Sequence, residues 1–285
     1  MANGNTYFRQ SPLKSNKNNA AIVNPENTDG HYIEIKNDNG LVFDKNYPYV
    51  DESKWFKFKA WWFRIFLVLI ILPVVRIRLG FKVVGKEKLK KYKDVIDNGI
   101  VSVCNHVHYW DYLGMLSVTL PYKPKFLAWA PNVKGALGKP MRLVGGIPIP
   151  EDDLSASISF SKSVGKYLEE GGWLHIFAEG SMWEYYKPIR PFKKGLATYS
   201  YKHNVPILPF AYRYRKPGFI RRVIFKQIAL YTLHVGEPIY RDDTLPKNEQ
   251  ILDLTRRSHK AVCELAGIEN NIYEPVFNDS KKINY

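Results

Sequence analysis

Between residues 80 and 266, short apolar runs alternate with longer stretches in which apolar residues recur every three or four positions. The short runs predict strands and the longer stretches predict helices. Because alternating strands and helices are typical of an α/β domain, we predict a mixed, largely parallel sheet flanked by helices. The expected strands are 80–84, 100–104, 125–130, 145–149, 174–178, 205–212 and 228–235, and the expected helices are 110–119, 154–170, 193–203 and 248–266.

The expected helix at 154–170 has the clearest boundaries. Asp152 and Asp153 precede it as N-terminal caps, and a Gly-Gly pair at 171–172 follows it. Its periodicity places four apolar side chains on one face, which we expect to be buried: Leu154, Ile158, Val164 and Leu168.

The segment from 55 to 79 is more apolar than the rest of the chain. Its uncharged run, 65–75, is shorter than the roughly 20 residues that a helix needs to cross a bilayer, and Pro73 is expected to kink or end the helix. Trp55, Trp61 and Trp62, with cations at both ends of the segment, match side chains that settle at a membrane–water boundary. We interpret the segment as an amphipathic helix that docks on a membrane without spanning it; a buried core helix is the alternative.

The N-terminal 54 residues have a different character. Nine of the first forty residues are Asn, and apolar periodicity is almost absent before Tyr32. The runs 32–35 and 41–43 flank an Asn-Gly turn at 39–40, which predicts a hairpin. The predicted organisation is therefore an Asn-rich arm and hairpin at 1–54, a membrane-docking segment at 55–79, and one α/β domain at 80–285.

Charge and cysteine content narrow the class of partner. The chain of 285 residues has 42 Lys and Arg against 27 Asp and Glu, a net charge of +15, which indicates an anionic partner. Three kinds of anionic partner fit this charge: a nucleic acid, an anionic membrane face, and an acidic carrier or substrate. No nucleic acid is expected, because the aromatics at 55–63 lie within an apolar run instead of alternating with a basic strand. Two cysteines exclude a disulfide framework and fit a reducing cytosol, and the polar N-terminus argues against a secretion signal.

The strongest candidate for chemistry follows the apolar run 100–104. His106 and Asp111 stand five residues apart where a strand is expected to end and a helix to begin, a common location for active sites in α/β folds. A His can accept a proton near pH 7, and a nearby carboxylate can fix its tautomer. A capping Asn105 beside a core His explains the same window equally well. A metal site is disfavoured, because the dinuclear hydrolase pattern His-x-His-x-Asp-His would need Asp and His where this chain has Trp110 and Asp111.

Several further blocks follow in a fixed order. They are Gly-Gly-Ile-Pro-Ile-Pro at 145–150, Ile-Phe-Ala-Glu-Gly-Ser at 176–181, Phe-Lys-Lys-Gly at 192–195 and Val-Pro-Ile-Leu-Pro-Phe at 205–210. Together with Asn-His-x4-Asp at 105–111, their order and spacing resemble the bacterial 1-acyl-glycerol-3-phosphate acyltransferase (lysophosphatidic acid acyltransferase) family. The resemblance covers roughly residues 80–215, about half of the chain, and its strength lies in the order of the blocks, since each alone is weak.

This resemblance implies a fold of the glycerolipid acyltransferase type and direct transfer of a fatty acyl group from a thioester to a glycerolipid hydroxyl. His106 would be the general base and Asp111 its orienting partner, with no metal and no cofactor, and with acyl-CoA or acyl carrier protein as co-substrate. Backbone N–H groups of the Glu-Gly-Ser turn would be available to the developing oxyanion. The implied location is the cytoplasmic face of the cell membrane, as a peripheral or monotopic protein. The substrate-binding residues would be Glu179, Gly180 and Ser181, with Gly145 and Gly146 allowing close backbone approach.

Three departures from the family pattern concern phosphate binding. Glu151 and Met182 replace motif arginines, and Trp129-Ala130 replaces the usual basic pair. Because Arg commonly clamps phosphate, other cations would take over, or the acceptor is not a simple phosphomonoester. We expect Arg190, Lys193 and Lys194, just after the Glu-Gly-Ser turn, to bind the acceptor headgroup; Arg142 and Lys187 are further candidates. The same losses support an alternative function, a non-catalytic lipid-binding or membrane-adaptor protein on the same fold.

One basic cluster lies outside these motifs. Six cations between 213 and 226 surround Phe219 and Ile220. Such a run is commonly a solvated face, and it equally suits a loop that touches anionic lipid.

Overall fold

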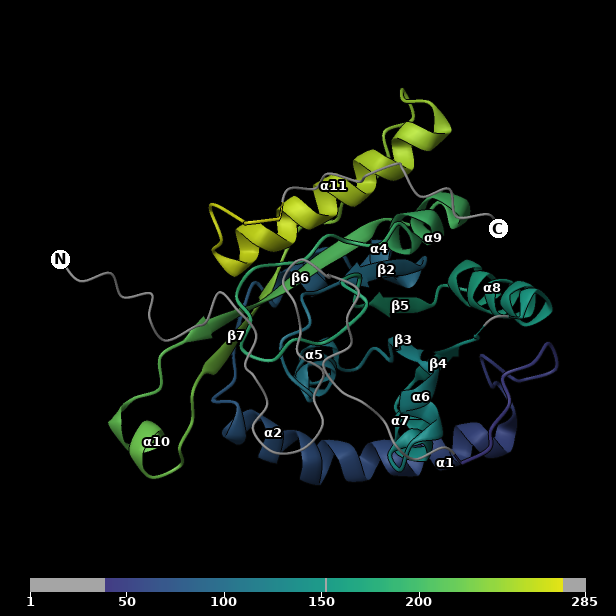
Figure 1. Ribbon diagram of the computed structural model, residues 1–285. Helices are drawn as coiled ribbons and strands as arrows, with labels where there is room; N and C mark the ends of the chain where they lie inside the picture. Colours follow the sequence, from purple (N-terminus) through teal and green to yellow (C-terminus); the bar gives the residue numbers. More distant parts are fainter. Residues whose placement is uncertain (1–38, 152, 274–285) are drawn as a thin grey trace.

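A seven-stranded sheet forms the centre of the computed structural model, which describes residues 39–151 and 153–273 (Figure 1). Its strand order is β1-β7-β6-β2-β5-β3-β4, and every pairing is parallel except that of β6 with β7. The predicted mixed, largely parallel sheet is therefore confirmed. The strands are β1 (Lys82–Val84), β2 (Ile100–Val103), β3 (Lys125–Trp129), β4 (Gly146–Ile149), β5 (Trp173–Ile176), β6 (Ile207–Arg215) and β7 (Leu230–Val235).

The central strand, β2, has the character of a strand covered on both faces. All four of its residues are buried, as expected for a parallel strand flanked by helices. Its neighbours are β5 and β6. The chain leaves β2 toward β3 on one side, and later crosses from β5 over β2 to β6 on the other side. In such sheets, the crevice outside the carboxyl ends of the strands is where ligands bind.

Helices cover both faces of the sheet (Figure 1). The pair α9 (Gly195–His203) and α11 (Lys247–Ala266) packs together against β2 and β6 on one face, with α8 (Leu154–Glu169) beside α9. On the other face lies α5 (Asp111–Thr119), almost entirely buried. Five shorter helices were not expected from the sequence, because one or two turns carry too little periodicity: α3 (Glu87–Lys91), α4 (Lys93–Asp97), α6 (Ala130–Lys134), α7 (Gly138–Leu143) and α10 (Phe219–Val223).

Helix α8 begins where the sequence predicted, but its buried face differs in part. Asp153 caps the helix, accepting a hydrogen bond from the backbone nitrogen of Ser155 at 2.8 Å. Val164 and Leu168 are buried as expected, whereas Leu154 and Ile158 are 70% and 61% exposed. The expectation for these two residues is wrong, because the face that meets the domain is the row of Ala156, Phe160, Val164 and Leu168, spaced four residues apart.

One long helix runs along the outside of the domain. It consists of α1 (Lys54–Phe66), a π-helical turn η1 (Leu67–Ile71) and α2 (Leu72–Arg78), 25 residues in all. Pro73 was expected to kink or end the helix, and the second of these is wrong because the helix continues to Arg78. The wider π turn immediately before Pro73 accommodates a ring that lacks an N–H and would otherwise strike the preceding turn.

The long helix carries apolar side chains on two opposite faces, one against the domain and one exposed. Leu67, Leu72 and Val75 are buried against the domain, where α1 meets α7 and α2 meets α5. The opposite face exposes apolar side chains every three to five residues: Trp55, Phe58, Trp62, Phe66, Leu69, Val74 and Ile77, between 48% and 70% exposed. The helix is long and apolar enough to cross a membrane, with a mean hydropathy of 2.1 over its most apolar window. The expectation that the segment is too short to cross a bilayer is therefore wrong, since the helix has the required length.

The residues that precede this helix belong to the domain. Phe43 and Tyr49 are buried in the main core, and the Arg142 guanidinium donates hydrogen bonds to the carbonyls of Pro48 and Tyr49 at 2.7 and 2.8 Å. The predicted hairpin falls largely outside the described residues, and residues 41–43 form no strand. The segment 43–49 is held instead by aromatic packing, with Tyr47 edge-on to both Phe43 and Tyr49.

Candidate active site

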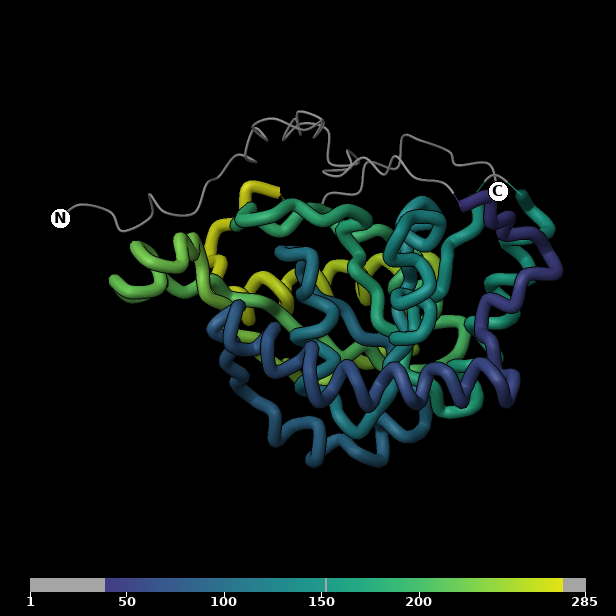
Figure 2. The backbone as a smooth tube through the Cα atoms, turned by 90° about the horizontal axis from the view of Figure 1, so that it is seen from below, coloured from purple at the N-terminus to yellow at the C-terminus, as the bar shows by residue number. Residues whose placement is uncertain are grey.

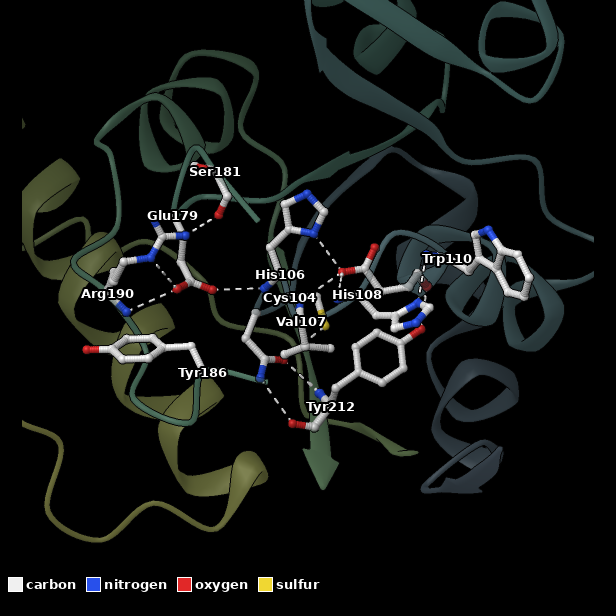
Figure 3. Close-up of polar contacts among 12 residues, drawn as sticks. Cys104, His106, Val107, His108, Trp110, Glu179, Ser181, Tyr186, Arg190 and Tyr212 are labelled. Atoms are coloured by element: carbon white, nitrogen blue, oxygen red, sulfur yellow. Dashed lines mark hydrogen bonds and ion pairs between the residues drawn. The ribbon is translucent and has the colours of Figure 1, made fainter. Parts of the chain in front are cut away.

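The predicted dyad follows the carboxyl end of the central strand, and Figure 3 shows His106 among its polar contacts. His106 follows β2 in the loop that leads to α5, and Asp111 is the first residue of that helix. The structure brings the two side chains together, with His106 Nδ1 at 2.6 Å from Asp111 Oδ2. The same carboxylate oxygen accepts hydrogen bonds from the backbone nitrogens of Val107 at 3.0 Å and His108 at 3.4 Å. Asp111 is therefore fixed by its own loop as well as by the imidazole.

The environment of the dyad suits proton transfer. The Asp111 side chain is 2% exposed, whereas that of His106 is 23% exposed, so the imidazole alone meets solvent or substrate. The His106 ring stacks on Phe177, with centroids 4.0 Å apart. With Nδ1 taken by the carboxylate, Nε2 is the nitrogen on the opposite side of the ring. This arrangement fixes both the tautomer and the plane of the imidazole, as the role of a general base requires.

A buried ion pair holds the backbone of His106. Glu179 Oε1 accepts a hydrogen bond from the His106 backbone nitrogen at 2.8 Å. Glu179 Oε2 accepts from the backbone nitrogen of Arg190 at 3.1 Å and from Arg190 Nε at 3.2 Å. The Arg190 guanidinium also donates to the Ser181 carbonyl and stacks 4.3 Å above the Trp183 ring. Glu179 therefore connects the two loops that follow β2 and β5.

This pairing corrects the interpretation of Arg190. The sequence placed its guanidinium on an acceptor phosphate, but its side chain is 0% exposed and its partners are protein groups. A charge buried at this depth is stable only because it is paired, so Arg190 is a structural partner of Glu179. Glu179 likewise uses both of its oxygens inside the protein.

The cations on the surface of this turn are Lys193 and Lys194. Both are exposed, and the Lys193 side chain lies across Gly180. The φ of Gly180 is +78°, which residues with a side chain rarely adopt. A Cβ at Gly180 would stand 2.8 Å from Lys193 Cε. The Gly180 backbone nitrogen donates to the Phe177 carbonyl at 3.0 Å. This amide is therefore not available to an oxyanion, contrary to the expectation for the turn, and Ser181 is buried beside it.

Gly145 and Gly146 do not lie beside the dyad. Gly146 pairs with Phe126, Phe126 with His175, and His175 with Ser102, which precedes His106 by four residues. Because β2 ends at Val103, the row of paired residues that contains Gly146 lies within the sheet, behind the loop that carries His106. Both pack against protein: a Cβ at Gly145 would meet the Pro124 carbonyl at 2.9 Å, and one at Gly146 would meet the Met141 carbonyl at 2.9 Å. Their small size serves packing between β3, β4 and α7.

Two features of the site were not expected from the sequence. Asn105 exchanges two hydrogen bonds with the backbone of Tyr212, at 2.7 and 3.0 Å, and so ties the end of β2 to β6. His108 Nε2 lies 3.4 Å from Glu184 Oε1, and burial lowers the pKa of His108 and raises that of Glu184. Asn105 belongs to the Asn-His-x4-Asp block, so the sequence marked it as a site residue. Nothing in the sequence indicates that His108 and Glu184 lie close together.

The positions that depart from the family pattern have other partners. Glu151 forms an ion pair with Lys134 at 3.2 Å, and Met182 is buried beside Trp183 and Tyr186.

Burial raises the pKa of the Cys104 thiol well above its usual range, which makes Cys104 a poor nucleophile. Within residues 39–151 and 153–273, no three His, Cys, Asp or Glu side chains stand close enough together to hold a metal ion.

A mostly parallel α/β sheet with a His–carboxylate pair at the end of its central strand is a type of site that enzymes use for general acid–base chemistry. Residues 80–213 match the family model described as Acyltransferase. The matched residues contain both members of the dyad, and the protein is an O-acyltransferase. The family implies an acyl donor and an acyl acceptor as substrates.

The comparison with solved structures includes the 1-acyl-sn-glycerophosphate (LPA) acyltransferase PlsC from Thermotoga maritima. It is 19% identical, the match covers 65% of this chain and 71% of that chain, and the TM-score is 0.45. No curated protein matches the chain.

Proposed function

We propose that the protein transfers a fatty acyl group from a thioester to the hydroxyl of a lysophospholipid or related glycerolipid, as a step of phospholipid biosynthesis. The observation that carries this proposal is the 2.6 Å contact between His106 and Asp111 inside an acyltransferase-family domain. The preferred acceptor is 1-acyl-glycerol-3-phosphate, and the donor is acyl-CoA or acyl carrier protein. No cofactor takes part.

In the proposed reaction His106 Nε2 removes the proton from the acceptor hydroxyl. The hydroxyl oxygen forms a bond to the thioester carbonyl carbon, and the carbon–sulfur bond then breaks. The imidazolium returns its proton to the departing thiolate, so that the products are the ester and the free thiol. Asp111 accepts the Nδ1 proton in a hydrogen bond throughout and stabilises the imidazolium. Since the acceptor is itself the nucleophile, no acyl-enzyme is formed.

We further propose that the long helix, Lys54–Arg78, lies in the plane of the cytoplasmic membrane surface. A spanning helix would meet lipid on all sides, whereas this helix buries Leu67, Leu72 and Val75 against the domain. The opposite stripe of Trp, Phe and aliphatic side chains would enter the lipid. Eight cations and no acidic residue between 53 and 86 favour an anionic surface. The α2 end of the helix packs against α5, the helix that begins at Asp111.

Lys193 and Lys194 are the cations that we propose for the acceptor headgroup, in place of Arg190. Both are exposed, and Lys193 crosses the turn that follows β5, beside Glu179. The double variant Lys193→Ala/Lys194→Ala is expected to raise the KM for lysophosphatidic acid about tenfold and to leave the KM for acyl-CoA unchanged. An unchanged KM for the acceptor would refute this role.

The experiment that tests the function follows thiol release from acyl-CoA in the presence of lysophosphatidic acid. The wild-type protein should release thiol only when the acceptor is present, and mass spectrometry should find the diacyl product. His106→Ala should lose at least a thousandfold in kcat while remaining folded and bound to vesicles. Turnover by His106→Ala would exclude the mechanism. Absence of turnover in the wild-type protein, with lipid binding intact, would favour the membrane-adaptor alternative.

A further inference from the structure

The hairpin that joins β6 to β7 projects beyond the edge of the sheet where the dyad lies. Tyr212 on β6 is level with Asn105, and β6 continues from there to Arg215, which pairs with Leu230 at the start of β7. The connecting residues 216–228, which we call the hairpin tip, contain α10 and stand clear of the domain (Figure 1). The tip therefore points away from the core on the same side as the active site.

The hairpin tip exposes apolar side chains at a density that a water-facing turn does not need. Six of its thirteen residues are exposed and apolar: Phe219 at 71%, Ile220 at 62%, Val223 at 52%, Ile224 at 66%, Phe225 at 57% and Ile228 at 44%. None of the residues of α10 is buried. A contiguous patch of this kind on a projecting element marks an interaction surface.

The charge of the tip identifies the partner. Lys216, Arg221, Arg222 and Lys226 lie among the apolar residues. No Asp or Glu occurs anywhere between Tyr185 and Gly236. Apolar side chains flanked only by cations complement an anionic lipid surface, into which the former insert while the latter meet lipid headgroups.

The tip is fixed to the end of the long helix. Arg221 Nη1 donates to the Ile77 carbonyl at 3.0 Å and to Gln227 Oε1 at 3.1 Å, and Gln227 donates to the Arg78 carbonyl. The Tyr231 backbone nitrogen donates to the Leu79 carbonyl at 3.1 Å. In two perpendicular views α10 lies beyond the α2 end of the helix (Figures 1 and 2). The apolar tip therefore lies next to the α2 end of the long helix and is attached to it.

We propose that the hairpin tip is a second membrane anchor, which inserts into an anionic bilayer beside the long helix and holds the dyad edge of the sheet against the lipid. A single helix lying in the membrane plane leaves the domain able to rock about the helix axis. A second contact beyond the end of α2 removes that freedom. The inference concerns lipid binding and does not depend on the acyl-transfer chemistry.

The test measures partition of the full-length protein onto vesicles of phosphatidylcholine with 30% phosphatidylglycerol, and onto vesicles of phosphatidylcholine alone. Phe219→Ser/Ile224→Ser/Phe225→Ser should bind both vesicles at least tenfold more weakly than wild type. Arg222→Gln/Lys226→Gln should bind the anionic vesicles about thirtyfold more weakly and the neutral ones about equally. The matched control is Leu154→Ser/Ile158→Ser, two similarly exposed apolar residues on α8, which should bind as wild type does.

A labelled variant tests insertion directly. Both native cysteines, Cys104 and Cys263, are buried, so that an environment-sensitive dye should react selectively with Phe219→Cys or with Leu154→Cys. On anionic vesicles the dye at 219 should gain severalfold in fluorescence and shift to the blue, and the dye at 154 should not change.

The proposal is overturned if the triple Ser variant binds vesicles like wild type, if the α8 control loses as much, or if the dye at 219 stays in water. It is also overturned if wild type is oligomeric and the triple variant becomes monomeric with unchanged vesicle binding, since the tip would then be a protein–protein interface. Failure of acyl transfer with intact tip-dependent binding would refute the proposed function alone.

Discussion

The buried pair of Glu179 and Arg190 separates two interpretations of the same arginine. If Arg190 bound acceptor phosphate, its replacement by Met would raise the KM for the acceptor and leave the fold unchanged. In the structure both side chains are almost fully buried, and Glu179 also holds the backbone of His106. Arg190→Met would therefore leave an unpaired carboxylate inside the protein.

The magnitude follows from the geometry. Two unit charges 3.2 Å apart attract by about 5 kcal/mol at an effective dielectric constant of 20, and this attraction offsets the cost of burying both. Removing one partner of a buried pair costs about 3–5 kcal/mol, because the other charge stays buried. We expect Arg190→Met to lose this much free energy of unfolding. The double variant Glu179→Gln/Arg190→Met should recover at least about 2 kcal/mol of it, because the Gln carbonyl still accepts from the His106 backbone nitrogen.

The assay is urea denaturation followed by circular dichroism, together with steady-state kinetics. The matched control is Lys166→Met, which breaks an exposed pair with Glu170 at 3.7 Å and should cost less than about 1 kcal/mol. For Arg190→Met, kcat should fall because the His106 loop loses its support, and the acceptor KM should change little. A fully stable Arg190→Met variant with a raised acceptor KM and normal kcat would refute the reasoning and restore the phosphate-binding role.

Three further predictions concern the dyad, the pH dependence of stability and a crowded turn. Asp111→Asn should lower kcat by a factor of about 10²–10⁴ with little change in acceptor KM, because the amide no longer fixes the Nδ1–H tautomer of His106. Steady-state kinetics measures this effect, and vesicle binding, which should not change, is the control. A normal kcat would contradict the prediction. Burial lowers the pKa of His175 to about 3, so the unfolded chain binds this proton below about pH 6.5 while the folded protein does not. As the pH falls from about 6.5 toward 3, the free energy of unfolding should therefore decrease, and at pH 5 the decrease should be about 2 kcal/mol. His175→Phe should make this dependence on pH less steep in urea titrations at several pH values. An equally steep dependence in the variant would exclude His175 as its cause. Gly99→Ala should lose about 2 kcal/mol in thermal or urea unfolding, because φ is +97° and the new Cβ would lie 2.4 Å from the Leu168 carbonyl oxygen, whereas Gly195→Ala, with open space, should cost nothing.

The sequence determined the parts of this protein that depend on local pattern. Apolar runs such as 100–104 gave all seven strands, and the spacing of His106 and Asp111 predicted a dyad that does form. Five residues across a strand end and a helix start form one short loop, so that their side chains have few ways to lie apart. The apolar character of 55–79 likewise identified the long helix, although not its length through Pro73, because accommodation by a π turn has no signature in composition.

Only the tertiary structure decided the roles that depend on partners distant in the chain. Arg190 is as basic as Lys193 in the sequence, but the fold buries the first against Glu179 and leaves the second on the surface. The sequence predicted that Gly145 and Gly146 lie beside the substrate, whereas the register of β4 places them along the sheet, away from His106. The apolar hairpin tip joined the long helix only when β6 and β7 brought Arg221 to the Ile77 carbonyl. In each case the deciding quantity was burial or proximity, and both arise from contacts between residues that the order of the chain keeps apart.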